Sequence, residues 1–173
     1  MFGNVFNNKK VFITGNTGFK GSWLTMWLLK LGADVVGYSK DIPTEPSAYN
    51  ILELKKKINN HSADVCDFEA LSSVINREKP DFIFHLAAQA IVSESYIDPT
   101  TTIRTNAVGT MNILETVRKI EWDCTVILIT SDKSYKNIEQ IWGYKETDKL
   151  GGDDVYSGSK GAAELIIQSY YES

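Results

Sequence analysis

Cysteine, histidine and excess positive charge are all scarce in this chain of 173 residues. Its 2 cysteines, Cys66 and Cys124, are too few for a disulfide framework and show no metal-ligand spacing. Its 18 Lys and Arg residues against 22 Asp and Glu residues give a net charge of −4, which argues against a nucleic-acid binder. We therefore expect no bound metal and no nucleic-acid partner.

Long hydrophobic runs are also missing from the sequence. The longest, around residues 23–29, is interrupted by Thr25 and stopped by Lys30, whereas a helix needs about 20 apolar residues to cross a bilayer. The first residues, MFGNVFNNKK, contain no apolar stretch after a basic start, so we expect no secretory signal. Hydrophobic residues still make up 43% of the chain, enough for a core. The sequence predicts one globular, cytoplasmic domain with no membrane contact.

Short apolar runs alternate with helical patterns along the chain. Strands are predicted at residues 9–14, 34–38, 58–65, 81–86 and 125–130. Helices are predicted at residues 21–31, 67–77, 98–117 and 154–171. The first of these helices carries Trp23 and Trp27 at helical spacing, and we expect both to face the core. Strands separated by helices predict right-handed βαβ units, hence an α/β fold with a Rossmann-type, doubly wound parallel sheet of strand order 3-2-1-4-5.

A glycine-rich turn follows the first predicted strand and opens the first predicted helix. Its seven residues, Gly15, Asn16, Thr17, Gly18, Phe19, Lys20 and Gly21, form a G-x-x-G-x-x-G pattern. Glycines there allow a tight turn and let backbone N–H groups approach a pyrophosphate at the positive end of the helix. A merely structural turn is the alternative, but the strand-turn-helix context favours dinucleotide binding.

The residues that follow the second and third strands are candidates for binding adenosine. Many dinucleotide-binding domains carry an acidic side chain after the second strand, which binds the ribose. Ser39 and Lys40 occupy that place here, so Asp41 is the candidate and the choice between NAD and NADP stays open. Asp64 and Val65 can hold the adenine through a carboxylate and a backbone N–H, although Asp64 can equally be a solvated turn residue.

Tyr156 and Lys160 are four residues apart in the last predicted helix, so their side chains share one face. A free phenol is a poor base at neutral pH, and a neighbouring ammonium favours the phenolate. Tyr-x-x-x-Lys is common by chance, but here it accompanies a glycine-rich cofactor turn. The pattern predicts a tyrosine base supported by a lysine.

The segment Ser131-Asp132-Lys133 directly follows the fifth strand, and ligands bind at the carboxyl ends of such strands. The Ser131 hydroxyl can bind a substrate oxygen beside Tyr156, and Asp132 and Lys133 add an acid and a potential base. A solvated turn is the alternative. The polar loop that continues through residues 131–153 is longer than most loops, which favours a functional role.

Together these segments resemble the extended short-chain dehydrogenase/reductases. Besides the glycine turn and the Tyr156/Lys160 pair, the resemblance includes Ser131, Asn106 with Gly109-Thr110, and the run His85-Leu86-Ala87-Ala88-Gln89. Within that superfamily the strings TGNTGFKGSWL, PTEPS, TSDKSY, WGYKETDKLGG and YSGSKGAAE are similar to CDP-glucose 4,6-dehydratases over nearly the whole chain. The family usually has His where this chain has Asn16. Its members are about twice as long, which implies an NAD(P)-binding Rossmann domain, residues 1–173, that stops before a sixth strand and lacks the C-terminal substrate-binding part.

The resemblance implies a function. The expected reaction is NAD-dependent dehydration of CDP-glucose to CDP-4-dehydro-6-deoxyglucose, through a 4-keto intermediate with internal return of hydride. The implied catalytic residues are Ser131, Asp132, Lys133, Tyr156 and Lys160. The implied NAD-binding residues are those of the glycine turn together with Asp41, Asp64, Val65, Leu86, Ala87, Ala88, Gln89, Asn106, Tyr156 and Lys160. By contrast, His85 is more readily explained as a buried structural residue than as a proton carrier.

The resemblance also implies a homodimer formed by the helices that start near Asp98 and Asp154, and a cytoplasmic role in lipopolysaccharide O-antigen supply. Two alternatives stay open. One is a dinucleotide-binding fragment that turns over no sugar, and the other is another nucleotide-sugar dehydratase or epimerase of the same superfamily. The Ser131-Asp132-Lys133 segment disfavours the second alternative.

Overall fold

The computed structural model describes residues 2–173 and contains a five-stranded parallel sheet of order β3-β2-β1-β4-β5. The strands are β1 Lys10–Thr14, β2 Asp34–Ser39, β3 Asn59–Ser62, β4 Phe82–His85 and β5 Thr125–Leu128. Thr14, the last residue of β1, pairs with Tyr38 on one side and with His85 on the other. The strand order reverses between β1 and β4, and a ligand-binding crevice is expected at the carboxyl ends of these two strands. The predicted fold class and strand order are confirmed.

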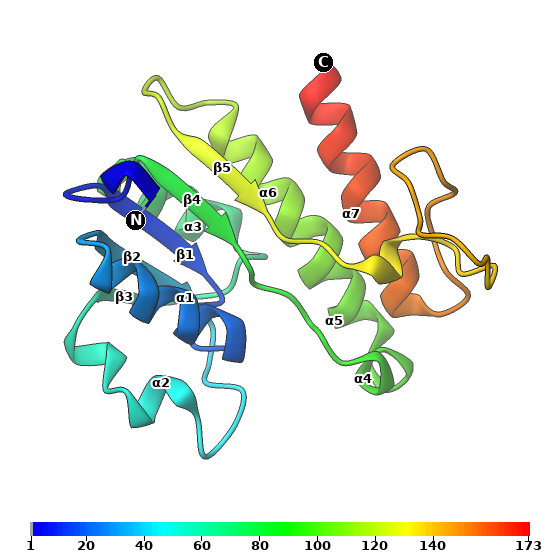
Figure 1. The fold of residues 1–173 in the computed structure, drawn as a ribbon, viewed down its shortest axis with the longest axis horizontal. Helices are drawn as coiled ribbons and strands as arrows, with labels where there is room; N and C mark the ends of the chain where they lie inside the picture. Colours follow the sequence, from blue (N-terminus) through cyan, green and yellow to red (C-terminus); the bar gives the residue numbers. More distant parts are fainter. Residues whose placement is uncertain (1) are drawn as a thin grey trace.

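Helices cover the sheet on both faces (Figure 1). Helix α1, Phe19–Lys30, packs on one face through Leu28, while α3, Phe68–Glu78, and α6, Gly109–Val117, pack on the other through Leu71, Ile75 and Ile113. The remaining helices are α2 Ala48–Ile51, α4 Val92–Ile97, α5 Pro99–Ile103 and α7 Val155–Glu172. A π-helical turn, Arg104–Val108, joins α5 to α6, and 3-10 turns lie at Phe2–Asn4, Leu54–Lys56 and Asp132–Ser134.

Three aspartates fix the starts of helices. The carboxylates of Asp67, Asp98 and Asp154 accept hydrogen bonds from the backbone N–H three residues on, at 3.0, 2.9 and 2.9 Å. Each satisfies an N–H group that the first helical turn leaves unpaired. At the other end of α1, Gly32 adopts φ +83°, the left-handed conformation that ends many helices. The predicted starts of α3, α5 and α7 are therefore confirmed.

The expectation that Trp23 and Trp27 face the core is wrong. Their side chains are 58% and 49% exposed, because α1 turns Gly21, Ser22 and Thr25 toward the sheet instead. Small residues on that face let the helix axis lie close to β1. The leucines of the apolar pattern, with Leu28 at 1% exposure, face the sheet, and only the two tryptophans lie on the outer side.

Two further differences concern segment boundaries. The third strand covers only Asn59–Ser62 rather than residues 58–65, and the helix predicted over residues 98–117 is divided by the π-helical turn. Helix α4 was not predicted, since Val92–Ile97 is short and has no apolar period. These differences leave the topology unchanged.

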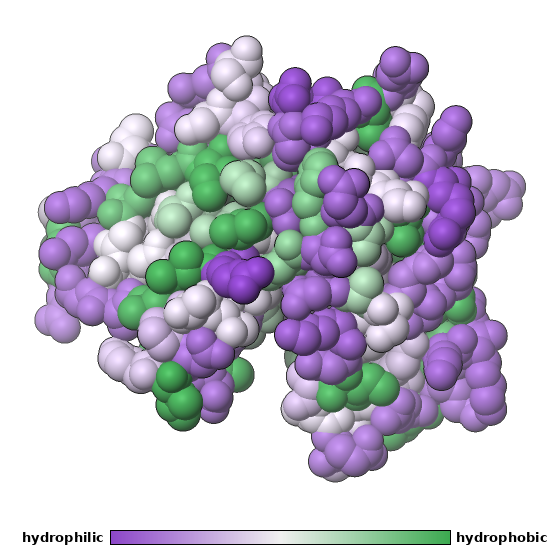
Figure 2. All heavy atoms as spheres, turned by 180° about the vertical axis from the view of Figure 1, so that it is seen from behind, coloured by the Kyte–Doolittle hydropathy of each residue, from purple (hydrophilic) through white to green (hydrophobic). Residues whose placement is uncertain are grey.

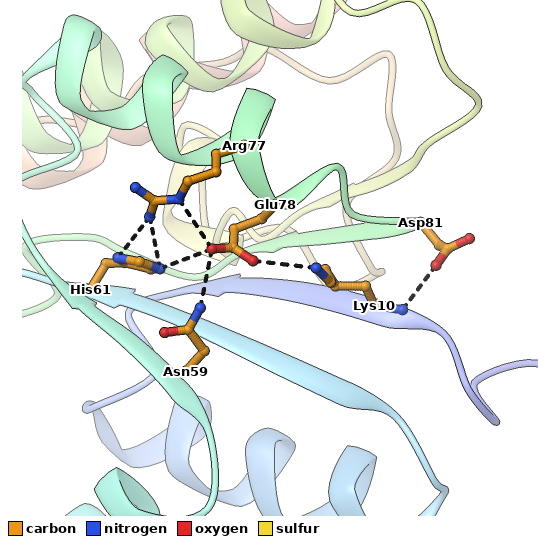
Figure 3. Close-up of polar contacts among 6 residues, drawn as sticks. All are labelled: Lys10, Asn59, His61, Arg77, Glu78 and Asp81. Atoms are coloured by element: carbon orange, nitrogen blue, oxygen red, sulfur yellow. Dashed lines mark hydrogen bonds and ion pairs between the residues drawn. The ribbon is translucent and has the colours of Figure 1, made fainter.

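A polar network joins the amino-terminal edge of the sheet to the end of α3 (Figure 3). The carboxylate of Glu78 lies within hydrogen-bond or ion-pair distance of Lys10, Asn59, His61 and Arg77. Burial alone would raise the pKa of Glu78, but the bond from Lys10 and the neighbouring cations hold it below its ordinary value. Because Lys10 begins β1, Asn59 begins β3 and Glu78 ends α3, the network ties these three elements together and stabilises the sheet.

Candidate active site

The glycine turn lies at the carboxyl end of β1, against the segment that follows β4. Gly15 has φ +72°, and its N–H donates to the carbonyl of Tyr38 at 2.9 Å. A Cβ atom on Gly15 would lie 2.8 Å from the backbone nitrogen of Ala87. Only glycine combines that conformation with so close an approach, so the turn and the segment after β4 form one wall of the crevice.

The amino terminus of α1 opens into the crevice with its backbone donors available. Gly18 caps the helix without a side-chain hydrogen bond, and the first turn contains no acidic residue. A Cβ atom on Gly21 would collide with the carbonyl oxygen of Gly15 and lie 2.7 Å from the Cα of Asn16. A helix start with free N–H groups and partial positive charge is suited to an anion such as a pyrophosphate.

The side chains of Asn16 and Thr17 join the glycine turn to β2, to β3 and to the residues that follow β2. Asn16 is fully buried; it accepts a bond from the Ser39 hydroxyl at 2.7 Å and donates to Asn60 Oδ1 at 2.7 Å. The Thr17 hydroxyl donates to the carbonyl of Asp41 at 2.6 Å. Because these side chains are paired with protein atoms, any contact of Asn16 with a cofactor is left to its backbone. Asp41 itself has an exposed side chain at the rim.

Asp64 and Val65 are fixed by partners that the sequence analysis missed. The Asp64 carboxylate accepts the N–H of Cys66 at 2.9 Å and pairs with Lys40 Nζ at 3.2 Å. Burial alone would raise the pKa of Asp64, but these two contacts lower it below its ordinary value. The buried Asn112 donates from Nδ2 to the carbonyl of Val65 at 2.9 Å. A polar residue amid the apolar pattern of α6 was the signal for Asn112.

The segment Leu86–Gln89 is tied down at both ends. At its start, the N–H groups of Leu86 and Ala87 donate to the Thr14 hydroxyl, each at 3.1 Å. At its end, Asn106 accepts the N–H of Gln89 at 2.9 Å and donates to the carbonyl of Gln89 at 3.1 Å. Ala88 lies between these anchors, so the candidate residues after β4 form a rigid lip of the crevice.

Helix α7 brings Tyr156 and Lys160 to the same crevice. Both residues are buried. Burial, followed by the positive charge of Lys20, lowers the pKa of Lys160 below its ordinary value. Lys20 belongs to the first turn of α1, so the glycine turn and α7 place two cations in one region. Such a region is suited to an anionic ligand.

The turn Asp132–Ser134 packs against α7. Gly161 permits the contact, since a Cβ atom there would lie 2.7 Å from the nitrogen of Gly151 and 3.3 Å from the carbonyl oxygen of Ser134. Ser131 lies 3.1 Å from Asp132 Oδ1 and accepts the N–H of Lys133 at 3.2 Å. Asp132 and Lys133 are themselves exposed.

The positive charge of Lys133 acts on the carboxylate of Asp154, the N-cap residue of α7. Burial alone would raise the pKa of Asp154, but hydrogen bonds from the N–H and hydroxyl of Ser157 lower it, as does the charge of Lys133. The sequence-predicted residues of β5 and α7 are thus brought together at the carboxyl end of β5. A base, an acid and a hydroxyl there can act on a polyhydroxylated substrate.

The parallel sheet, its crevice and the glycine turn define a Rossmann-type α/β domain of the kind found in nucleotide-sugar epimerases and dehydratases. The family model for GDP-mannose 4,6 dehydratase matches residues 12–173, and the chain belongs to that family. Among curated relatives, a CDP-glucose 4,6-dehydratase of Salmonella typhimurium is 47% identical over 98% of this chain and 47% of its own length. A GDP-mannose 4,6-dehydratase of Vibrio cholerae is 30% identical over 95% of this chain and 46% of its own length.

Solved structures agree with this membership. A UDP-glucose 4-epimerase of Thermus thermophilus, in complex with NAD, superposes with a TM-score of 0.77 at 26% identity, covering 94% of this chain and 51% of that one. The chain thus spans about half the length of the relatives it matches. Within residues 2–173, none of the helices combines the length and apolarity needed to cross a membrane.

Proposed function

We propose that this chain carries the cofactor site and the catalytic residues of an NAD-dependent CDP-glucose 4,6-dehydratase, a hydro-lyase. One observation carries the proposal: the turn with Ser131, Asp132 and Lys133 packs on the helix that bears Tyr156 and Lys160, beside the glycine turn. The 47% identity to a CDP-glucose 4,6-dehydratase supports the choice of reaction and of sugar nucleotide.

The residues of the crevice fit an NAD molecule. The uncapped start of α1 suits its pyrophosphate, and the cations Lys20 and Lys160 suit its negative charge. Asp41 at the rim and Asp64 with Val65 beside it would hold the adenosine. The lip Leu86–Gln89 and Asn106 would contact the nicotinamide half. The carboxylate of Asp41 disfavours the extra 2′-phosphate of NADP by charge repulsion, whereas that of Asp64 is already paired with Lys40.

When bound, NAD supplies the oxidant that takes hydride from sugar C4 and later returns it to C6. The chain's own residues move the protons. Tyr156 takes the proton of the 4-hydroxyl, Lys160 keeps the phenolate available, and Ser131 orients the 4-oxygen. A ketone at C4 makes the C5 proton acidic, so Lys133 in its neutral form can remove it, and the resulting ammonium gives a proton back to C5 when hydride is returned to C6. Asp132 in its acid form protonates the leaving 6-hydroxyl as water departs.

A second copy of the chain is the proposed partner. Helices α5, α6 and α7 pack together and expose Ile103, Met111 and Leu165. Figure 2, the view from behind, shows hydrophobic side chains gathered on the half of the molecule that holds α7. This supports a homodimer through the helices that start after Asp98 and Asp154. Light scattering should give twice the monomer mass for the wild type and the monomer mass for Leu165→Glu.

The test of the proposed function is incubation of the chain with CDP-glucose and NAD⁺, following the absorbance of the 4-keto product in alkali. Dinucleotide binding is titrated on the same sample. Product confirms a dehydratase site within these residues, and GDP-mannose and UDP-glucose serve as control substrates. Binding of NAD⁺ without product would instead support the alternative of a cofactor domain that turns over no sugar. With this activity we also propose a cytoplasmic role in supplying CDP-6-deoxy sugars, for instance to O-antigen.

A further inference from the structure

A buried chain of hydrogen bonds runs from β1 through His85 to the π-helical turn. His85, the last residue of β4, is 2% exposed. Its Nδ1 lies 2.7 Å from the Thr14 hydroxyl oxygen, and its Nε2 lies 3.2 Å from the Thr110 hydroxyl oxygen. A hydroxyl can donate one hydrogen bond and accept others, so the neighbours of each threonine determine which way the protons point.

The direction is set at Thr14. Its oxygen already accepts the N–H groups of Leu86 and Ala87, which can only donate. Its own hydrogen is therefore available to His85 Nδ1, which accepts it. If Nδ1 carried a proton instead, three donors would point at the Thr14 oxygen. A neutral imidazole has one N–H group, so the proton of His85 is on Nε2 and points to Thr110.

The chain continues through Thr110 to the backbone of Asn106. The Thr110 hydroxyl accepts from His85 and donates to the carbonyl of Asn106 at 2.7 Å. Asn106 lies in the middle of the π-helical turn, where Gly109 N–H bonds to the carbonyl of Arg104, five residues back. Single π-helical turns inside helices are frequent at functional sites.

From Asn106 the contacts spread to both walls of the crevice. Its side chain holds both backbone groups of Gln89, at the end of the lip Leu86–Gln89. It also donates to the Ser159 hydroxyl at 2.9 Å, and that hydroxyl donates to the carbonyl of Tyr156 at 2.6 Å. His85 is thereby linked to the lip at its start through Thr14 and at its end through Asn106.

The charge state of the His85 imidazole agrees with this direction of the hydrogen bonds from Thr14 to Asn106. Burial first, and the charge of Lys160 second, lower the pKa of His85 to about 3. A doubly protonated ring would put a donor on Nδ1 and oppose the hydrogens of Thr14. The neutral ring leaves every polar atom of the chain with one donor or acceptor that matches it.

We propose that His85 is a positioning residue for the nicotinamide half of the cofactor: its neutral Nε2–H form, held by Thr14, fixes Asn106 through Thr110 and so sets the lip Leu86–Gln89 against α7. This inference rests on the proposed NAD site. It assigns His85 no contact with substrate and no proton transfer. A buried filler residue would need only the shape of the ring, whereas this role needs the hydrogen on Nε2 and the hydroxyl that receives it.

The test replaces the hydroxyl without changing the volume. Thr110→Val removes the link between His85 and Asn106, and Thr110→Ser is the matched control that keeps it. Titrations with NAD⁺ and with AMP, which lacks the nicotinamide half, are compared for each variant. Thr110→Val loses both hydrogen bonds of the hydroxyl, and we expect it to weaken NAD⁺ binding by at least about tenfold, with AMP binding unchanged. Thr110→Ser should match the wild type for both ligands.

Equal weakening of NAD⁺ and AMP, or no weakening of either, would overturn the proposal. A second measurement does not depend on any ligand or on that variant. The chain has 2 histidines, so ¹⁵N spectra of histidine-labelled wild type give signals from two rings, and comparison with His85→Gln assigns the signals of His85. We expect its proton on Nε2, and a proton on Nδ1 would refute the proposal.

Amide hydrogen exchange separates this proposal from the proposed function. Thr110→Val should speed exchange at the Gln89 amide about tenfold, and exchange at Val36 in β2 should not change. If the wild type binds neither NAD⁺ nor AMP, the cofactor function fails. In that case the imidazole spectrum and the Gln89 exchange rate still decide the role of His85, and unchanged Gln89 exchange counts against it.

Discussion

The cofactor side and the sugar side of the crevice are built to different degrees. On the cofactor side, Thr14, Asn16 and Asn106 are at most 1% exposed, and their polar atoms have partners. On the proposed sugar side, Asp132 and Lys133 are exposed, and within residues 2–173 the hydrogen bonds of the Ser131 side chain stay inside its own turn. A lysine works as a base when it is desolvated and neutral. The residues of the proposed cofactor cradle therefore hold one another in place, whereas desolvation of the proposed acid–base pair must come from bound sugar or from polypeptide packed over the turn.

The largest expected effect separates chemistry from binding. Tyr156→Phe removes the hydroxyl proposed to take the sugar proton but keeps the buried ring, so we expect kcat to fall by about 10³. The affinity for NAD⁺ should stay within threefold of the wild type. Release of the 4-keto product measures the first quantity, and titration measures the second. A Phe variant that keeps a tenth of the wild-type rate would contradict the role of Tyr156.

A pair of glycine substitutions tests how tightly the cofactor side is built. Gly21→Ala places a Cβ atom against Gly15 and Asn16, and we expect it to lower the free energy of unfolding by about 3 kcal/mol and to abolish NAD⁺ binding. The matched control is Gly158→Ala in α7, where a Cβ atom meets nothing within 4 Å. That control should stabilise the chain by about 0.5 to 1 kcal/mol. Urea unfolding with and without NAD⁺ measures both; equal stabilities for the two variants would argue against the cradle.

A substitution on the sugar side should slow the reaction without weakening cofactor binding. Asp132→Asn keeps the size of the side chain but cannot donate as an acid, so dehydration should slow by about 10². NAD⁺ binding and the stability of the fold should not change, because the side chain is exposed. Water release at the normal rate would remove Asp132 from the mechanism. A loss of NAD⁺ affinity would show that the two sides are coupled.

The pH dependence of stability reports on the cofactor side. The pKa of His85 is about 3 in the folded chain against an ordinary 6.5. The unfolded chain thus binds a proton first as the pH falls, and the contribution of neutral His85 is fully present above pH 6.5. Below 6.5 it declines by about 1.4 kcal/mol for each pH unit until about pH 3. Urea unfolding between pH 7 and 4 should show a shallower decline for His85→Gln; equal slopes would contradict the burial of a neutral ring.

The smallest effect is expected on the outer face of α1. Trp23→Ser should change the free energy of unfolding by less than about 1 kcal/mol, since the side chain is 58% exposed. Leu28→Ala, at a position on the same helix that is 1% exposed, should cost about 2 to 5 kcal/mol. Thermal and urea unfolding of both variants give the comparison. A large loss from Trp23→Ser would restore the original expectation that this side chain belongs to the core.

The topology could be predicted from the sequence because each strand and helix is marked by a local sequence pattern. Apolar runs mark β1, β4 and β5, and Asp67, Asp98 and Asp154 mark helix starts that the structure confirms. The outer position of Trp23 and Trp27 could not be read this way. Periodicity shows that a helix has an apolar face, but the crowding at Gly21 decided which face meets the sheet.

The motifs of the site could be predicted from the sequence, but the hydrogen bonds and ion pairs that hold them in place could not. The glycine turn, the Tyr156/Lys160 pair and the Ser131 segment are short patterns that can be seen within a few residues. The partners of His85 are 71 residues before it and 25 residues after it along the chain. Lys40 and Asn112, which hold Asp64 and Val65, are likewise distant in sequence. Contacts of that kind depend on tertiary packing, and no local pattern specifies them.

The π-helical turn between α5 and α6 acts as a phase shift. Each residue of an α-helix rotates the next by about 100°, so one extra residue in a turn changes which side chains face inward beyond it. Thr110, Asn112 and Thr116 all point inward after Arg104–Val108. Deleting one residue of that turn would leave every amino acid of α6 in place yet rotate the helix, taking both the His85 link and the Val65 anchor out of register at once.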